Sequence, residues 1–334
     1  MALEASASTT TFEDVSKSHW ASTAIYDYLN KGYIKKENSA YFYPNNAVTR
    51  GEALSIAVKV LKLPLNAEVK LKAKDLKENH PYYKEISKMI ELGVIENVDY
   101  ICPDEPLKRS ELTKVLAKAF KIEVDNHNKT RFKDYSSTFW ARKYIESLAD
   151  ANLIKGIGNN KFSPNSNVTK AELIALLSRM EKFKEREAKL EVIYDFIKKD
   201  YVSTVNEYAV WVNDIIYLVN LERKKQNLIP LQHDRKLTQI AILKVKDMTQ
   251  HNYFDHKSPL YGNPWDMAML FDYKFVRFGE NIGRNHTSPQ AVVKAWMNSS
   301  DHRKNILNSN YKKIGVGISK TKSGKYYWVQ HFSS

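Results

Sequence analysis

The sequence predicts a multidomain protein in which an all-helical repeat region, a helical connector and an α/β layered domain follow one another along 334 residues. An eleven-residue pattern recurs three times in the first half of the chain. A charge-rich stretch without Pro or Gly follows Met180, and helical periodicities with late strand patterns fill the remainder. At this length two or three domains are expected, and 43% hydrophobic residues are enough to form real cores.

The repeat consists of a large apolar residue, a spacer, Pro, three turn-forming residues, Val or Leu, a polar residue, a basic residue, a spacer and Glu. It reads FYPNNAVTRGE at 42–52, ICPDEPLKRSE at 101–111 and FSPNSNVTKAE at 162–172. From Arg50 to Arg109 is 59 positions and from Arg109 to Lys170 is 61, which is the length of one supersecondary unit. A second shared block precedes each copy, so we assign three modules, at 12–65, 70–125 and 130–180.

Each module is expected to form a helix, a loop and a second helix. In the first module, apolar residues at helical spacing end at Gly32, a helix stop, and helical spacing resumes after the motif. Thr49 with Glu52, and Thr169 with Glu172, form the T-x-x-E pattern of a capping box, in which two side chains satisfy backbone N–H groups at a helix start. The repeated motif therefore marks a helix N-terminus.

The basic residue of the motif, which is Arg50, Arg109 or Lys170, falls in the first helical turn, where the macrodipole disfavours a cation by roughly 0.3 to 1 kcal/mol. One interpretation is an anion site built from backbone N–H groups and the basic side chain, with Trp20 and Trp140 as flat faces on which a sugar ring stacks. The alternative is that each basic side chain pairs with a carboxylate of the neighbouring module.

The TRGE, KRSE and TKAE stretches resemble the TRAE motif of the S-layer homology (SLH) module, and the resemblance covers residues 12–180. It implies a pseudo-threefold helical bundle that attaches proteins non-covalently to the secondary cell-wall polysaccharide of Gram-positive bacteria. The usual ligand of the family carries a pyruvate ketal, whose carboxylate would be the anion, and Arg50, Arg109 and Lys170 would carry the binding. The middle module departs from the pattern, because Lys108 replaces the capping Thr and Pro81 replaces the Trp.

The formal charge of +14 suits an anionic wall polymer or nucleic acid equally, and the absence of any nucleic-acid motif in the sequence favours the former. A single cysteine, Cys102, excludes an intrachain disulfide, and its place in the motif indicates a packing role. No membrane-spanning stretch and no signal peptide are visible, and residues 1–11 read as a flexible polar lead. Secretion to the cell wall or S-layer is thus expected from the modules alone.

Residues 181–208 are predicted to form a helical connector, and a second domain is predicted over 209–334. Two helical patterns come first, at 210–227 and 236–252, and a third begins near Pro289. Strand patterns follow at 312–320 and 326–332, so the domain is expected to be an α/β layer fold.

Three polar residues from separate loops of this domain, His256, Glu280 and His302, are candidates for a cleft. Two imidazoles and a carboxylate suit a divalent metal such as Zn²⁺, with Glu280 as ligand or general base. The alternative is structural: His256 caps a helix and Glu280 pairs with a nearby Arg. Of the other histidines in this half, His331 lies beside the last apolar strand residue, and none is favoured to complete a ligand set.

The stretches NYFDHKSP, GENIG, AVVKAWMNSSDHRKNIL, YKKIGVGI and YYWVQHF resemble the bacterial form of the CAP (SCP/TAPS) superfamily, over roughly 209–334. The resemblance implies an α-β-α sandwich with a central cleft, and His256, Glu280 and His302 match three members of the family tetrad. The fourth member, a Glu, is Ser299 here, which removes an acid/base carboxylate pair.

Two classes of function follow. In the first, the SLH modules anchor the chain and the CAP domain presents its cleft to a ligand or a divalent metal without turnover. In the second, the CAP domain is a metal-dependent hydrolase of peptides or wall polymers, with His256 and His302 holding the ion and Glu280 activating water. The departure at Ser299 favours the first class.

Overall fold

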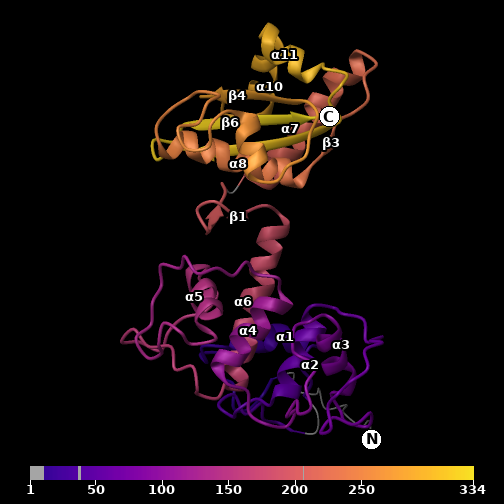
Figure 1. Cartoon of the computed structure of the whole chain (residues 1–334), viewed down its shortest axis with the longest axis vertical. Helices are drawn as coiled ribbons and strands as arrows, with labels where there is room; N and C mark the ends of the chain where they lie inside the picture. The colour runs from indigo at the N-terminus through magenta and orange to yellow at the C-terminus, as the bar shows by residue number, and fades with distance from the viewer. Residues whose placement is uncertain (1–10, 37–38, 206) are drawn as a thin grey trace, which may run out of the picture. The chain divides into compact units, whose positions relative to one another are not determined.

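The structure is a computed structural model that describes residues 11–36, 39–205 and 207–334, and the chain divides into two compact units between Glu185 and Arg186 (Figure 1). Most of the predicted polar lead, residues 1–10, lies outside the described residues. The expected order is confirmed, with a helical repeat region first and an α/β domain second.

The N-terminal unit contains one pair of helices per module, as the repeat predicts. They are α1 (Ser22–Asn30) with α2 (Arg50–Val60), α3 (Tyr83–Glu91) with α4 (Arg109–Ala119), and α5 (Arg142–Asp150) with α6 (Lys170–Ala188). The second helix of every pair begins at the basic residue of the motif. The capping box is complete at Thr169 and Glu172, whose side chains accept from each other's backbone N–H groups at 3.2 and 2.9 Å. At the middle module Glu111 accepts from Lys108 N, but the lysine side chain offers no acceptor in return.

The three motifs are joined by backbone hydrogen bonds that run in cyclic order. Val48 N–H donates to Val168 O at 2.9 Å, Val168 N–H donates to Leu107 O at 2.9 Å, and Leu107 N–H donates to Val48 O at 3.0 Å. All three side chains are buried. Because every module both donates to one neighbour and accepts from the other, the three helix N-termini are held together as a closed set.

An aspartate near the start of each module fixes the turn that leads into its motif. Asp14, Asp75 and Asp134 each accept the N–H groups of two successive turn residues at 2.7 to 3.1 Å. The second residue of each pair has a positive φ of 54° to 60° and is Tyr43, Cys102 or Ser163. A left-handed conformation is unfavourable for a residue with a side chain, so the carboxylate stabilises the turn. The backbone of Cys102 thus belongs to one of these turns, and its side chain is half-buried.

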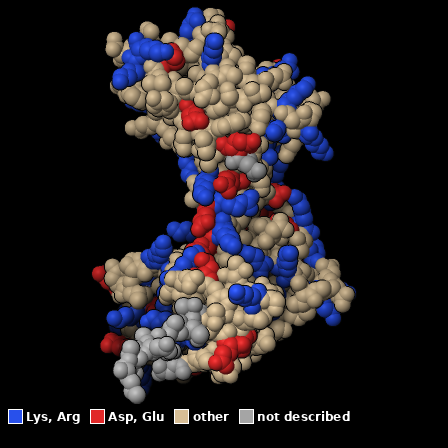
Figure 2. All heavy atoms as spheres, turned by 180° about the vertical axis from the view of Figure 1, so that it is seen from behind, with Lys and Arg blue, Asp and Glu red and all other residues tan. Residues whose placement is uncertain are grey.

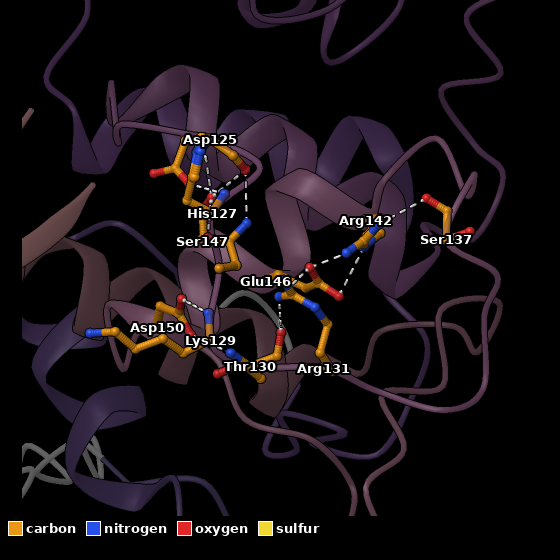
Figure 3. Close-up of polar contacts among 11 residues, drawn as sticks. Asp125, His127, Lys129, Thr130, Arg131, Ser137, Arg142, Glu146, Ser147 and Asp150 are labelled. Carbon is orange, nitrogen blue, oxygen red and sulfur yellow. Dashed lines mark hydrogen bonds and ion pairs between the residues drawn. The ribbon is translucent and has the colours of Figure 1, made fainter. Parts of the chain in front are cut away.

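The third module also contains a buried carboxylate that no sequence pattern indicated (Figure 3). Glu146 on α5 is 2% exposed and accepts from Arg131 at 3.0 Å and from Arg142, one turn earlier, at 3.1 Å. Nearby, Asp150 accepts the backbone N–H groups of Lys129 and Thr130 at 2.7 and 2.8 Å. The segment that enters the third module is thus held against α5 by charge-assisted hydrogen bonds.

The predicted helical connector over 181–208 is wrong beyond its first turns. Helix α6 continues only to Ala188, and the chain then forms an antiparallel hairpin of β1 (Val192–Asp195) and β2 (Asp200–Ser203). Asp195 is fully buried and accepts from Ile197 N, Lys198 N and the Tyr261 hydroxyl. Ile193 lies in the main core of the C-terminal unit, so the hairpin belongs to that unit, which starts well before the expected residue 209.

The C-terminal unit is built on a four-stranded sheet in the order β3-β5-β6-β4. The strands are β3 (Gln232–His233), β4 (Phe278–Arg284), β5 (Lys313–Lys320) and β6 (Tyr326–Ser333), and only β3 pairs in parallel. The helices are α7 (Tyr208–Lys225), α8 (Arg235–Gln250), α9 (Pro264–Leu270), α10 (Pro289–Asn298) and α11 (Ser300–Ile306). The three predicted helices and two predicted strands are α7, α8, α10, β5 and β6, and the shorter elements were not predicted.

Helices cover both faces of this sheet (Figure 1). On one face, Tyr327 and Val329 of β6 pack against α8. On the other, Trp328 stacks on Trp211 of α7 at a centroid distance of 5.3 Å. Since successive strand residues point to opposite faces, this alternation places the sheet between two helical layers.

Two glycines of β5, Gly315 and Gly317, allow α8 to lie directly on the sheet. A Cβ atom at either position would come within 2.3 Å of the α8 backbone, a separation that no side chain tolerates. The close approach of α8 to the sheet positions the loop that follows the helix, and this loop carries His256.

The aspartate turns predict an acid-sensitive N-terminal unit. Burial raises the pKa of Asp134, but its backbone N–H donors outweigh burial and hold the pKa below the ordinary value. A carboxylate with a depressed folded-state pKa stabilises the fold above its unfolded pKa of about 3.9 and loses that contribution as the pH falls through the folded value. We expect Asp134→Asn to lower the free energy of unfolding by about 1 kcal/mol at pH 7 and to flatten its decline below pH 4.

Thermal unfolding between pH 7 and pH 2 measures both effects. The exposed Asp301→Asn is the control, because its carboxylate pairs with an exposed lysine at the surface. An Asp134→Asn curve parallel to that of the wild type would contradict the proposed role of the turn.

Candidate functional site

The basic residues of the three motifs form ion pairs between modules. Arg50 contacts Glu111 at 2.9 Å and Arg109 contacts Glu172 at 3.0 Å. In the third pair, Lys170 contacts Glu52 at 3.3 Å. Each basic residue thus reaches the motif glutamate of the next module in cyclic order. Of the two interpretations of the motif, pairing with a neighbouring carboxylate is the one observed.

The two motif arginines are further engaged by backbone carbonyl groups. Arg50 donates to Ile101 O at 2.7 Å and to Cys102 O at 3.2 Å. Arg109 donates to Phe162 O at 3.0 Å and Lys155 O at 3.3 Å, and its guanidinium lies 4.7 Å from the centre of the Phe162 ring. These contacts satisfy much of the donor capacity of both arginines inside the protein.

Two of the motif cations nevertheless line pockets in the N-terminal unit. Lys170 lines an open pocket of about 500 Å³ together with three other lysines, while Glu52 is the one carboxylate among its described lining residues. Aromatic side chains form much of the remaining wall, namely Phe12, Tyr33, Tyr41, Phe42, Tyr43 and Tyr82. The pocket therefore combines positive charge with flat apolar surfaces.

Arg109 lines a second pocket of about 200 Å³, and Trp20 of the first module lines it as well. Trp20 is 63% exposed, so its ring is available to a ligand. Trp140 is 50% exposed, and the Lys114 ammonium group lies 5.7 Å from its ring centre. The structure thus brings Trp20 and Arg109 together, whereas Trp140 lies beside a different cation.

In the C-terminal unit, Glu280 is buried between two histidines. Its Oε1 is 2.7 Å from Nδ1 of His256 and its Oε2 is 2.8 Å from Nε2 of His331. An ionised carboxylate only accepts hydrogen bonds, so both imidazoles donate to it. Nδ1 of the fully buried His331 has no partner in the described part of the chain. The sequence had indicated His331 without favouring it.

Strand pairing brings Glu280 and His331 together. Glu280 on β4 lies directly opposite His331 on β6, and residues opposed in an antiparallel pair share one face of the sheet. His256 comes from the loop after α8, which is held by the buried Lys244. The Lys244 ammonium group donates to Asp255 O at 2.8 Å and to His256 O at 2.6 Å. Had the pairing of β4 with β6 been predicted from the sequence, it would have identified His331 as a neighbour of Glu280.

The electrostatics of the cluster favour an ionised Glu280 and a readily protonated His256. Burial raises the pKa of Glu280, but hydrogen bonds from His256 and His331 outweigh it and the pKa lies below its ordinary value. The hydrogen bond to Glu280 raises the pKa of His256. Burial and the positive charge of His256 lower the pKa of His302, the third predicted residue. His302 lies on α11, and its backbone carbonyl accepts from the Asn281 side chain at 3.1 Å.

His256 faces solvent at an open pocket of about 310 Å³, which Trp265, Phe278 and Glu280 also line. Both oxygens of Glu280 are taken by imidazoles, so Glu280 is placed to orient His256 rather than to contact a ligand. Within the described residues, no group of three His, Cys, Asp or Glu side chains is arranged to hold a metal ion. The two imidazoles of His256 and His302 are the metal donors that the predicted set offers.

Charged side chains are distributed over both units. On the face seen in Figure 2, Lys and Arg side chains are spread over the N-terminal and C-terminal units, with Asp and Glu between them. In the described part of the chain no helix combines the length and the apolar character needed to cross a bilayer.

Comparison with known protein families agrees with both halves of the sequence prediction. The S-layer homology domain matches at residues 11–54, 74–113 and 131–174. The cysteine-rich secretory protein family (CAP) matches at residues 216–332. The family matches therefore cover most of each of the three modules and most of the C-terminal unit.

Three curated relatives match part of the chain. The uncharacterized protein YkwD of Bacillus subtilis is 46% identical over 130 residues, which is 39% of this chain and 49% of the relative. The S-layer protein sap of Bacillus anthracis is 28% identical, covering 54% of this chain and 22% of the relative. A cellulosome-anchoring protein of Acetivibrio thermocellus is 33% identical, over 44% and 35%. The chain thus spans less than half the length of each of these relatives.

Among solved structures, an extracellular protein containing an SCP domain from Bacillus anthracis is similar, with 31% identity, coverage of 40% of this chain and 45% of that chain, and a TM-score of 0.35. An outer surface protein from Borrelia burgdorferi has 25% identity, coverage of 36% and 92%, and a TM-score of 0.34. From the family matches, the chain contains three S-layer homology domains followed by a domain of the cysteine-rich secretory protein (CAP) family.

Proposed function

We propose that this chain is a cell-surface protein of a Gram-positive bacterium, anchored non-covalently by its SLH domains to pyruvylated secondary cell-wall polysaccharide. The three SLH domains would form a pseudo-threefold bundle, which the cyclic backbone bonds between Val48, Leu107 and Val168 support. The names of the S-layer and cellulosome-anchoring relatives support a surface location.

The observation that carries this proposal is the lysine-rich, aromatic-lined pocket around Lys170. A pyruvate ketal bears a carboxylate on a sugar ring, so a suitable site needs a cation next to a flat apolar surface. Lys35, Lys59 and Lys170 supply cations, while Tyr41 and Tyr43 are exposed rings. Arg50 and Arg109 would act mainly through the ion pairs that hold the modules together.

The CAP domain is proposed to present the His256 pocket to a ligand without turnover. Glu280 orients His256 and raises its pKa, and Trp265 and Phe278 add apolar surface. Nδ1 of His256 donates to Glu280, so the other ring nitrogen, Nε2, donates to a ligand only in the protonated imidazole, which the raised pKa favours. A ligand with an acceptor group and an apolar face fits this chemistry.

A metal-dependent hydrolase is the second candidate, and the hydrogen bond from His256 to Glu280 is the observation that favours it. Metal-binding imidazoles commonly donate their other ring N–H to a carboxylate, which fixes the tautomer. His256 and His302 would hold the ion, which would supply an activated water. Glu280 would orient His256, since neither of its oxygens is available to accept a proton from that water.

Neutralising the Lys170 pocket is expected to weaken wall binding. For Lys170→Gln with Lys35→Gln we expect about a tenfold loss in affinity or more, because a hydrogen bond to a charged group is removed. Sedimentation of the full chain with purified cell walls measures the affinity, and circular dichroism checks that the helices remain. Cell walls stripped of ketal pyruvate should bind the wild type and the double variant equally weakly.

The control is Lys322→Gln with Lys325→Gln, which removes the same charge from an exposed turn of the CAP domain. If the control weakens binding equally, and added salt abolishes the wild-type interaction, general charge attraction explains the binding and the proposal is wrong.

The orientation of His256 by Glu280 gives a titration prediction. Loss of the carboxylate in Glu280→Gln should lower the pKa of His256, because the hydrogen bond that raises it is removed. In the wild type, stabilisation from His256 is present below the unfolded pKa of about 6.5 and is lost as the pH rises through the higher folded value. NMR titration of the imidazole tests this, and an unchanged His256 pKa in the variant would contradict the geometry.

Zinc binding distinguishes the two candidates. If the CAP domain presents its pocket to a ligand without turnover, we expect the full chain to bind less than one equivalent of zinc, because both oxygens of Glu280 accept hydrogen bonds from His256 and His331. Zinc titration of the wild type, His256→Ala and His302→Ala measures this. One tightly bound equivalent that is lost in both variants would overturn the expectation and favour the hydrolase.

A further inference from the structure

The pocket that contains Trp20 and Arg109 holds a cation whose charge has no counterpart in the described part of the protein. Arg179 on α6 lines this pocket and is half-buried. Its Nε donates to Ala175 O on its own helix at 3.3 Å, and no carboxylate among the described residues pairs with it. The fork of two terminal nitrogens is therefore uncommitted.

Arg109, the motif residue of the same pocket, differs from Arg179 in this respect. Its guanidinium pairs with Glu172, donates to two backbone carbonyls and lies on the Phe162 ring. To bind an external anion, Arg109 would have to give up contacts that join the second and third modules. Arg179 would give up no ion pair with the described residues.

The charges around Arg179 also favour an anion. Burial, and then the positive charge of Arg109, lower the pKa of Arg179, so an incoming anion would relieve the cost of keeping the guanidinium charged. Lys155 is exposed at the same pocket, and Glu172 is the one carboxylate among the described residues that line it. With Arg109, three cations face one carboxylate.

The repeat shows that Arg179 departs from its equivalents. Ten positions separate it from Thr169, and the same distance separates Lys59 from Thr49 and Lys118 from Lys108. Lys59 donates to Tyr33 O at 3.4 Å, and Lys118 donates to Gly93 O at 2.9 Å, so both cap the end of a preceding segment. Arg179 is the member of this set whose terminal donors are not used in that way.

We propose that Arg179, and not the motif residue Arg109, contacts the carboxylate of an anionic saccharide in this pocket, with Trp20 stacking on the sugar ring. A planar guanidinium binds a carboxylate through two parallel hydrogen bonds, and the exposed indole provides the apolar face. This assignment rests on the proposed function and adds a binding residue outside the TRAE-like motif.

The test compares full-length variants in binding isotherms with purified cell-wall sacculi that retain their secondary polysaccharide. We expect Arg179→Gln to bind about tenfold more weakly or worse, and Arg179→Lys to retain part of the affinity through its charge. Lys118→Gln, the matched change at the equivalent position of the second module, should bind like the wild type. Thermal unfolding establishes that each variant is folded.

The Arg109→Gln variant distinguishes the structural role of Arg109 from the binding role of Arg179. We expect it to lower the unfolding temperature, because it breaks contacts between modules, while Arg179→Gln leaves the unfolding temperature near that of the wild type. Wild-type affinity in a folded Arg179→Gln protein would overturn this assignment alone. Failure of the wild type itself to bind the sacculi would overturn the anchoring function, and the assignment with it.

Discussion

The N-terminal unit depends on a closed set of backbone hydrogen bonds among three motif segments. Val48, Leu107 and Val168 each donate to one neighbour and accept from another, with their side chains buried at the centre. A chain closed in this way cannot lose one bond without exposing a buried backbone group of the next module, which makes the set cooperative. It also fixes where each second helix begins, and so directs every motif cation toward the motif glutamate of the next module. The pockets around Lys170 and Arg109 are consequences of that placement.

The same reasoning explains why the motif arginines, Arg50 and Arg109, are poor candidates for a purely external role. A guanidinium with five donors, already bound to a carboxylate and to carbonyl groups, contributes to the interface between modules first. Its positive charge still shapes the field of the pocket. A side chain without an ion pair in the described residues, such as Arg179 on α6, is the one we propose for contact with the ligand. The three repeats are therefore similar in architecture but differ in the chemistry of their surfaces.

In the C-terminal unit the equivalent constraint is the register between β4 and β6. It places Glu280 opposite His331 inside the protein, where an isolated carboxylate would be costly, and two imidazole donors offset that cost. His256 then completes the pair of donors from a loop that Lys244 holds in place. One buried carboxylate thus sets the orientation and the protonation of the exposed histidine at the pocket.

Local patterns in the sequence determined the repeats, the helix starts, the two late strands and two of the residues that line the C-terminal pocket, His256 and Glu280. Capping boxes and amphipathic spacing involve residues only a few positions apart, so they can be recognised in the sequence alone. Contacts between distant segments could not be predicted from the sequence. The aspartate turns connect residues nearly thirty positions apart. The hairpin at 192–203 is stabilised by burial of Ile193 in the core and by the hydrogen bond from Tyr261 to the buried Asp195, which exist only in the folded unit. Packing between modules decided that the motif cations pair with neighbouring glutamates. The register between β4 and β6 decided that His331, and not His302, binds Glu280. Both depend on the tertiary structure, because these contacts form only when distant segments of the chain come together.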